Sequence, residues 1–152
     1  MSSDVGLGAL TRPDLVFPDL PATDSQGVLR DLAGRVAAQG LVKNGEELFQ
    51  SLWEREQLGS TGIGQGVAIP HCKLKGLARG VVAVGLVPAG VDFGAVDQQP
   101  VKVFFLVVSP AEAPAEHLQI LAAISRWIRA DQHAGRLLTL HDPAAVYDLL
   151  RE

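Results

Sequence analysis

The sequence contains a single cysteine, Cys72, among 152 residues, so no disulfide can form within the chain. It also lacks any apolar run approaching the roughly 20 residues of a membrane-spanning helix. The longest run, at 81–91, is interrupted by Pro88 and Gly90. The N-terminal stretch MSSDVGLGAL has no basic region and does not resemble a secretory signal peptide. We therefore expect a protein of the reducing cytoplasm, with no segment inserted into a membrane.

Basic residues are also few. Lys and Arg number 13 against 17 Asp and Glu, which gives a formal net charge of −4. Proteins that bind nucleic acid usually present a basic surface, so this balance argues against a nucleic-acid partner. One small basic cluster, Lys73, Lys75 and Arg79, stands out. It is either a solvated loop or a local positive field that attracts an anion or an acidic partner.

Apolar residues make up 47% of the sequence, enough for one domain, residues 1–152, with a packed core. Helical spacing of apolar residues predicts helices over about 24–39, 44–58, 113–130, 131–139 and 143–150. Three of these helices begin at a predicted cap residue: Asp24 (or Thr23), Asn44 and Asp142. Short β-branched runs predict buried strands at 67–69, 81–88 and 101–108, whereas the proline-rich residues 1–22 suggest irregular structure or an edge strand. Because helices and buried strands interleave, the predicted class is α/β, with a sheet covered by helices on both faces.

A glycine-rich stretch, STGIGQGVAIPHCK at 60–73, precedes one histidine. It is not a dinucleotide fingerprint, because Val67 occupies the third glycine position, and it is not a P-loop, because Gly66 is not followed by Lys and Ser or Thr. The stretch 60–66 is expected to be a loop. Its backbone N–H groups either bind an anion or only form a tight turn.

The histidine after this loop, His71, is preceded by Pro70, which favours an extended conformation at Ile69. His71 is therefore expected at a rigid strand end beside the loop. A neutral imidazole offers a nucleophilic nitrogen at about pH 7, and phosphoryl transfer requires well-placed donors around the transferred group. These features make His71 a candidate phosphoryl acceptor, with a structural histidine as the alternative.

The run EREQLGSTGIGQGVAIPHCK at 54–73 resembles the phosphohistidine signature of the enzyme IIA domains of the bacterial phosphotransferase system, fructose/mannitol class. The segments 24–40, 92–110 and 116–129 are similar to the first helix and to the later strand and helix of that family. The resemblance thus covers most of the chain. It implies a mixed β-sheet flanked by helices on both faces, and a phosphoryl relay that needs no cofactor.

The resemblance also assigns site residues. His71 matches the histidine that accepts a phosphoryl group from the phosphocarrier HPr, and Arg55 and His117 match residues close to that group. A guanidinium gives planar, permanently charged donors to phosphate oxygens, and a second imidazole can donate one more hydrogen bond. That Arg55, His71 and His117 converge is implied by the family alone.

Further candidates for binding the phosphoryl group come from the same signature. Ser60, Thr61 and Gly62 offer hydroxyl and backbone donors. Glu56 either orients His71 or Arg55, or only solvates the end of its helix. Each of these roles has a purely structural alternative.

The Cys-Lys-Leu sequence after His71 and the DQQPV sequence at 97–101 favour the nitrogen-regulatory branch of the family. Such a protein would accept phosphate from HPr and contact a regulatory target protein. A free-standing fructose- or mannitol-specific component that passes phosphate to a IIB domain is the alternative, and a protein-interaction module that is never phosphorylated is a third. A homodimer formed through Trp127 or the N-terminal segment is left open.

The remaining reactive side chains are expected to be structural. Cys72 should point away from His71, because neighbours on an extended segment face opposite sides. His133 and His141 are isolated in the sequence and are expected at the surface, and no ligand spacing suggests a metal site. Trp53 and Trp127 are expected to pack in the core or at an interface.

Overall fold

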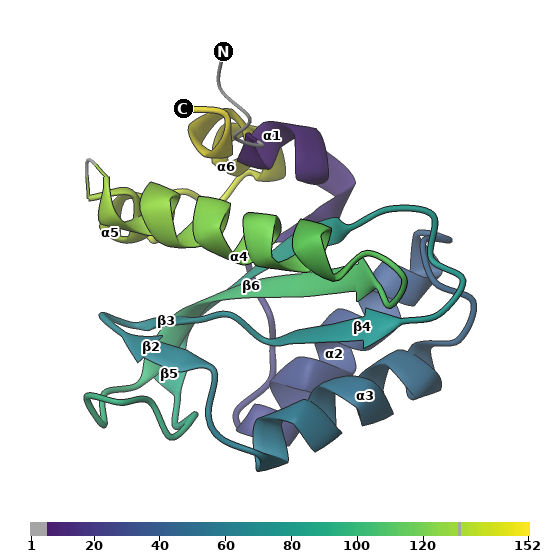
Figure 1. The fold of residues 1–152 in the computed structure, drawn as a ribbon. Coiled ribbons are helices and arrows are strands. Elements are labelled where there is room, and N and C mark those ends of the chain that lie inside the picture. The colour runs from purple at the N-terminus through teal and green to yellow at the C-terminus, as the bar shows by residue number, and fades with distance from the viewer. Residues whose placement is uncertain (1–5, 131) are drawn as a thin grey trace.

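The computed structural model describes residues 6–130 and 132–152, which form a six-stranded mixed sheet with helices on both faces (Figure 1). The helices are α1 (Leu7–Leu10), α2 (Ser25–Ala38), α3 (Gly45–Gln57), α4 (Pro114–Arg129), α5 (His133–Leu137) and α6 (Pro143–Leu150), with a 3₁₀ turn at Pro13–Leu15. The strands are β1 (Val16–Phe17), β2 (Gly62–Gly64), β3 (Val67–Ala68), β4 (His71–Leu74), β5 (Val81–Val91) and β6 (Val101–Pro110). The predicted α/β class and mixed sheet are confirmed.

Strand β6 is the centre of the sheet. It pairs antiparallel with β5 along one side, and parallel with β3 and then β4 along the other. β1 lies parallel to β5 at one edge, and β2 pairs antiparallel with β3 at the other. The parallel pairing of β4 with β6 sets His71 opposite Val107, and this register fixes where the histidine lies.

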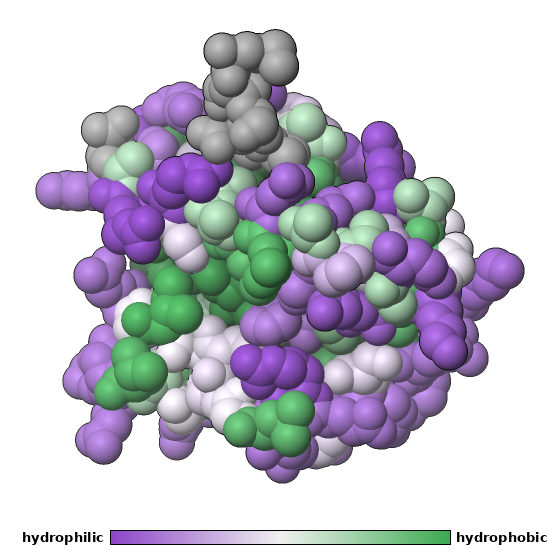
Figure 2. Space-filling model, in the orientation of Figure 1, coloured by the Kyte–Doolittle hydropathy of each residue, from purple (hydrophilic) through white to green (hydrophobic). Residues whose placement is uncertain are grey.

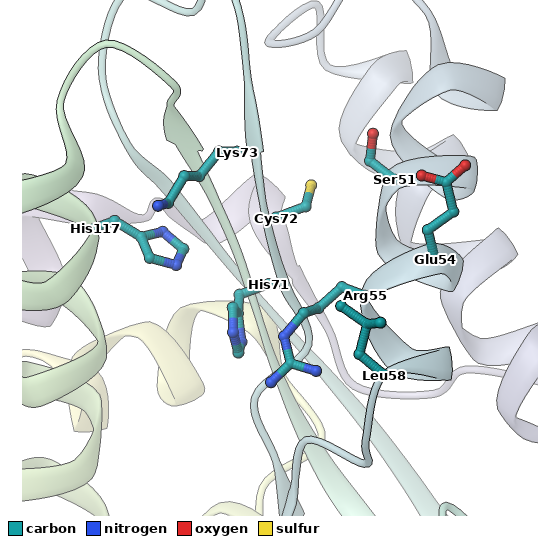
Figure 3. Close-up of a pocket in the computed structure, with 8 residues that line it drawn as sticks. All are labelled: Ser51, Glu54, Arg55, Leu58, His71, Cys72, Lys73 and His117. Carbon is teal, nitrogen blue, oxygen red and sulfur yellow. The ribbon is translucent and has the colours of Figure 1, made fainter.

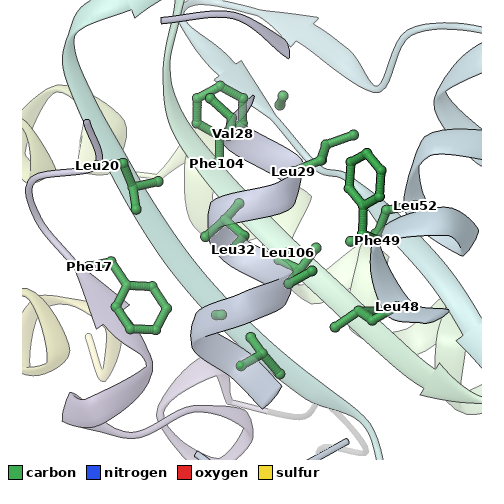
Figure 4. Packing of buried hydrophobic residues seen from close by; sticks show 14 of the residues in the cluster. Phe17, Leu20, Val28, Leu29, Leu32, Leu48, Phe49, Leu52, Phe104 and Leu106 are labelled. Atoms are coloured by element: carbon green, nitrogen blue, oxygen red, sulfur yellow. The ribbon is translucent and has the colours of Figure 1, made fainter. Parts of the chain in front are cut away.

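The core has two layers because side chains of a buried strand alternate between faces. Phe104 and Leu106 of β6 pack against α2 and α3, as Figure 4 shows. Val103 and Phe105 point to the other face, where they join side chains of α4 and α6. The near-continuous apolar sequence of β6 is thus explained by helices on both sides. The face of the molecule drawn in Figure 2 is mainly hydrophilic, with hydrophobic side chains in separate patches.

The helix starts agree with the predicted caps. The Asp24 carboxylate accepts a hydrogen bond from the Gly27 amide at 2.7 Å, and the Asn44 side chain accepts from the amides of Glu46 and Glu47. These bonds satisfy donors that have no partner inside the helix. Asp142 lies at the predicted N-cap of α6, but its side chain makes no capping hydrogen bond.

Two predictions around the glycine-rich stretch are wrong in part. Residues 60–66 are not all loop, because β2 pairs with β3 across a register shift. The sequence analysis also missed β4, which begins at His71 itself. Its mixed sequence HCKL has no strand pattern of its own, and hydrogen bonds to the central strand β6 hold it extended.

Near the N-terminus, β1 confirms the expected edge strand, although α1 and the 3₁₀ turn were not expected. Residues 1–5 and 131, at the start of two predicted segments, lie outside the described residues. None of the helices described over 6–130 and 132–152 is long and apolar enough to cross a membrane.

The expectation that His133 lies at the surface is wrong. Its side chain is buried, and Nδ1 donates a hydrogen bond to the Trp127 carbonyl at 2.8 Å. The two rings stack with centroids 4.2 Å apart. An imidazole with its Nδ1 satisfied and an aromatic partner can enter the core, which its isolated place in the sequence did not reveal. His141 is exposed as expected, and Trp127 is buried.

Phe104 provides a test of the two-layer core. It is fully buried and packs edge-to-face on Phe93 at 5.1 Å. Phe104→Ala should lower the free energy of unfolding by about 3–5 kcal/mol, because it removes buried apolar surface and leaves a cavity. Leu118→Ala, at a side chain that is 67% exposed, should change it by less than about 0.5 kcal/mol. Urea denaturation measures both, and equal losses for the two variants would contradict the assigned layers.

Candidate active site

Three elements that are distant in the sequence meet around one open pocket of about 610 Å³. The end of α3, strand β4 and the start of α4 surround it, as the close-up in Figure 3 shows. The lining residues are Ser51, Glu54, Arg55, Leu58, His71, Cys72, Lys73 and His117. The pocket therefore brings together Arg55, His71 and His117, the three residues that the family resemblance places near the phosphoryl group.

His71 is held in one orientation by its own strand. Its Nδ1 lies 2.7 Å from the Ile69 carbonyl oxygen. A carbonyl can only accept, so Nδ1 carries the proton, and the lone pair of the neutral ring is on Nε2. Burial lowers the pKa of His71 below its ordinary value of 6.5, and the positive charges of Arg55 and Lys73 act in the same direction, against the Ile69 hydrogen bond. The neutral form of His71 is thus favoured, with its lone pair on Nε2.

His117 lies in the first turn of α4 and is buried. Its ring is tilted by 56° to that of His71, with the centroids 5.3 Å apart. Nδ1 lies 2.8 Å from the Ser109 hydroxyl, so Nε2 is the ring nitrogen left for the pocket. Burial lowers the pKa of His117, followed by the charges of His71 and Lys73. Two neutral imidazoles therefore lie side by side.

Arg55 lies in the last turn of α3, with its guanidinium next to His71 in Figure 3. Its Nη1 donates a hydrogen bond to the Gly59 carbonyl at 2.9 Å, which anchors the group to the loop that follows its own helix. A guanidinium has five N–H donors, so further donors remain for an anion in the pocket. Arg55 thus supplies fixed positive charge beside the nucleophile.

Glu56, Ser60, Thr61 and Gly62 are not among the residues that line this pocket. The Thr61 amide and hydroxyl donate to the two carboxylate oxygens of Glu56 at 2.7 and 2.8 Å. Burial raises the pKa of Glu56, and the two bonds from Thr61 oppose that shift. These contacts join the end of α3 to the loop that leads to β2, so Glu56 and Thr61 hold the loop beside Arg55.

The other two residues of this group, Ser60 and Gly62, pack the loop against the segment that contains Phe93 and Ala95. The Ser60 hydroxyl donates to the Phe93 carbonyl at 2.6 Å and accepts from the Gly62 amide at 3.0 Å. A Cβ on Gly62 would lie 2.9 Å from Ala95, so only glycine allows this close approach. The contacts of Ser60, Thr61, Gly62 and Glu56 explain the structure of the loop, and their predicted contact with a phosphoryl group stays a prediction.

Two residues of this region, Lys73 and Ser109, were not predicted from the sequence. Lys73 was assigned only to a basic cluster, but it lies two residues from His71 on β4, so both line the pocket. The strand period of two residues would have shown this had β4 been recognised. Ser109, at the end of β6, has no signal in the sequence that connects it with His117. Cys72 is buried in the core layer, although it also lines the pocket with His71, and burial raises its pKa to about 12, so it is not a thiolate.

Within the described residues, no group of three or more His, Cys, Asp or Glu side chains could hold a metal ion. The pocket residues include two imidazoles, a guanidinium and an ammonium group, together with the Glu54 carboxylate and the Ser51 hydroxyl. Such a set can bind an oxyanion through hydrogen bonds and positive charge, and it has one neutral nucleophile.

The charge of Lys73 gives a direct test of this electrostatic arrangement. We expect Lys73→Met to raise the pKa of His71, because it removes a positive charge that disfavours the imidazolium form. Lys75→Met, which changes the exposed lysine two residues further along, should leave the pKa unchanged. Titration of the histidine ring resonances by NMR at low salt measures both. A fall in the pKa of His71 in the Lys73 variant, or equal shifts in both variants, would contradict the assignment.

The comparisons with known proteins agree with this geometry. Residues 9–152 match the family described as "Phosphoenolpyruvate-dependent sugar phosphotransferase system, EIIA 2". The chain is 36% identical over 141 residues to a nitrogen regulatory protein of Bradyrhizobium diazoefficiens, covering 93% of this chain and 92% of that protein. It is 31% identical over 146 residues to the fructose-specific EIIA component of Haloferax volcanii, covering 96% and 95%.

A similar solved structure is that of the nitrogen regulatory protein IIA-Ntr from Neisseria meningitidis. It has a TM-score of 0.86 and 26% sequence identity, covering 94% of this chain and 97% of that one. The mannitol IIA of Escherichia coli, with a TM-score of 0.77 and 20% identity, shares the fold. The matched sequence, the mixed sheet and the pocket lead to one conclusion: this chain belongs to the EIIA 2 family of the phosphoenolpyruvate-dependent sugar phosphotransferase system.

Proposed function

We propose that this protein is a phosphocarrier that accepts a phosphoryl group on Nε2 of His71 from an HPr-type protein and acts as a nitrogen-regulatory IIA protein. One observation supports the chemistry above all others. Nδ1 of His71 is committed to the Ile69 carbonyl, so the lone pair of the neutral ring is on Nε2, in a pocket shared with Arg55 and His117. An in-line phosphoryl transfer requires such a fixed, neutral nucleophile among cationic and N–H donors.

The proposed transfer exchanges one bond to phosphorus for another. The Nε2 lone pair of His71 forms the new bond to phosphorus as the bond from phosphorus to the donor protein breaks. The donor keeps that electron pair. The His71 ring becomes positively charged and keeps its Nδ1 proton, and the hydrogen bond to Ile69 becomes charge-assisted. Arg55, Lys73 and His117 stabilise the charge on the phosphoryl oxygens.

Exposed apolar side chains beside the pocket suit the docking of a carrier protein. Leu58, which lines the pocket, is 84% exposed, and Leu118, next to His117 in α4, is 67% exposed. A protein partner that covers these leucines would exclude water from the transfer, which strengthens every electrostatic contact with the phosphoryl group. The partner is therefore a protein with a phosphorylated residue presented between apolar contacts.

The regulatory assignment follows the chemistry of the product. A phosphoryl group adds a charge of about −2 at the mouth of the pocket, which is enough to create or abolish a contact with a target protein. The nitrogen regulatory relative at 36% identity and the IIA-Ntr structure at TM-score 0.86 support this branch. The fructose-specific relative at 31% identity supports a second candidate, transfer from His71 to a IIB domain for sugar uptake.

Phosphorylation in a reconstituted system tests the acceptor. Wild-type protein mixed with phosphoenolpyruvate, enzyme I and HPr should gain a phosphate that is labile in acid and stable in alkali. His71→Ala should lose the label, because it removes the only nucleophile proposed here. His141→Ala, at an exposed histidine outside the pocket, should label as wild type. A wild-type protein that stays unlabelled would refute the phosphocarrier proposal and favour the third alternative, a protein-interaction module that is never phosphorylated.

The branch is tested by a second acceptor. We expect the phosphorylated protein to keep its phosphate when fructose- and mannitol-type IIB domains are added, because the proposed role is a lasting change of surface charge. A fructose-specific IIA with its cognate IIB domain serves as the positive control. Loss of the label to a IIB domain within seconds would overturn the regulatory assignment and establish the sugar-specific candidate.

A further inference from the structure

One buried hydrogen bond behind the pocket has no role in the transfer step described above. The Ser109 side chain, at the end of β6, is fully buried, and its Oγ lies 2.8 Å from Nδ1 of His117. Among the described residues, this is the one hydrogen bond recorded for either side chain. His117 lines the pocket while Ser109 does not, so the Ser109 hydroxyl reaches the pocket through the imidazole, whereas its backbone pairs in register with Lys73 of β4.

The direction of this hydrogen bond follows from counting donors and acceptors. The serine hydroxyl has one proton, and its only recorded partner is Nδ1 of His117. If Nδ1–H donated to Ser109, the buried hydroxyl proton would have no acceptor, which is costly. If the hydroxyl donates to Nδ1, no donor is left unsatisfied. Neutral His117 then carries its single proton on Nε2, the nitrogen left for the pocket.

We propose that Ser109 is a positioning residue that fixes the tautomer of His117 and presents its Nε2–H to the phosphoryl group on His71. This inference rests on the proposed function and adds a specific role for the hydroxyl. Without it, Nδ1 would compete for the proton, and part of the population would turn an Nε2 lone pair towards the phosphoryl oxygens. Two lone pairs facing each other repel, whereas an N–H group stabilises developing negative charge.

A hydroxyl suits this position in both charge states of His117. Burial lowers the pKa of His117, and the charge of Lys73 and that of a protonated His71 act in the same direction, so the imidazolium form is disfavoured before transfer. After transfer, the phosphoryl group near His71 favours protonation. Nδ1 then becomes a donor, and the Ser109 hydroxyl can rotate to accept from it. One side chain thereby satisfies the buried nitrogen before and after transfer.

A matched pair of substitutions isolates the hydroxyl. Ser109→Thr keeps the hydroxyl and adds a methyl group. Ser109→Val gives a side chain of the same shape as threonine but without the hydroxyl. Both side chains are β-branched and suit a strand. Any strain from the added volume is shared, so the difference between them reports the hydrogen bond. Ser109→Ala removes the hydroxyl without added volume and covers the case in which the larger side chains do not fit.

Two measurements are compared across these variants. The ¹⁵N chemical shifts of His117, recorded at about pH 8 where the ring is neutral, identify the protonated nitrogen. Rapid-quench kinetics give the rate of phosphoryl transfer from phosphorylated HPr. We expect wild type and Ser109→Thr to carry the proton on Nε2. Ser109→Val and Ser109→Ala should show a mixture of tautomers and a rate reduced roughly three- to tenfold, the effect of one lost hydrogen bond.

The outcomes separate this inference from the proposed function. An Nδ1–H tautomer in wild type, or equal tautomer populations and rates in the Thr and Val variants, overturns it. A loss of stability in Ser109→Val with an unchanged tautomer and rate assigns Ser109 a structural role only, which also overturns it. The NMR measurement needs no phosphoryl donor. Wild-type protein with the Nε2–H tautomer that takes no label would refute the phosphocarrier assignment while upholding the role of Ser109 in orienting His117.

Discussion

The hydrogen bond from Nδ1 of His71 to the Ile69 carbonyl is the contact on which the chemistry of the pocket depends. It selects the tautomer, fixes the ring and leaves the lone pair on Nε2, the atom proposed as the nucleophile. The bond exists because β4 pairs parallel with β6 immediately after Pro70, so the backbone that carries the histidine cannot shift. Two core layers hold β6 in place. A fold-level constraint, the register of one short strand, thereby sets the reactivity of one side chain.

Around that histidine, the protein uses charge and burial together. Burial and the charges of Arg55 and Lys73 lower the pKa of His71, so the nucleophile is not lost to protonation. In the proposed transfer, the same two cations attract the oxygens of the phosphoryl group. Both effects require that the cations be held near the ring while their charges remain solvated. Arg55 achieves this through its bond to Gly59, and the Glu56–Thr61 contacts hold that loop in turn.

Much of this arrangement could be predicted from the sequence, and the rest could not for physical reasons. The apolar period predicted α2, α3 and α4, cap residues marked the starts of α2 and α3, and the signature indicated His71. Strand β4 was missed because HCKL is extended only through its pairing with β6. Lys73 was missed for the same reason, because its place in the pocket follows from the strand period. His133 was misplaced because its stacking on Trp127 depends on packing between α4 and α5. The contact of Ser109 with His117 could not be predicted from the sequence, because it joins the end of a strand to the next helix.

The two histidines of the pocket illustrate how similar side chains take different roles through their second nitrogen. At His71 the partner of Nδ1 is a carbonyl, which accepts only, so the outer nitrogen is a lone pair suited to attack. At His117 the partner is a hydroxyl, which can donate, so the outer nitrogen can carry a proton suited to stabilise an anion. The rings are 5.3 Å apart and share the burial and the nearby Lys73 charge that lower both pKa values. Burial and the Lys73 charge, which the two rings share, therefore do not separate their roles. The difference between a nucleophile and a donor lies in the atom that each ring meets on its buried side.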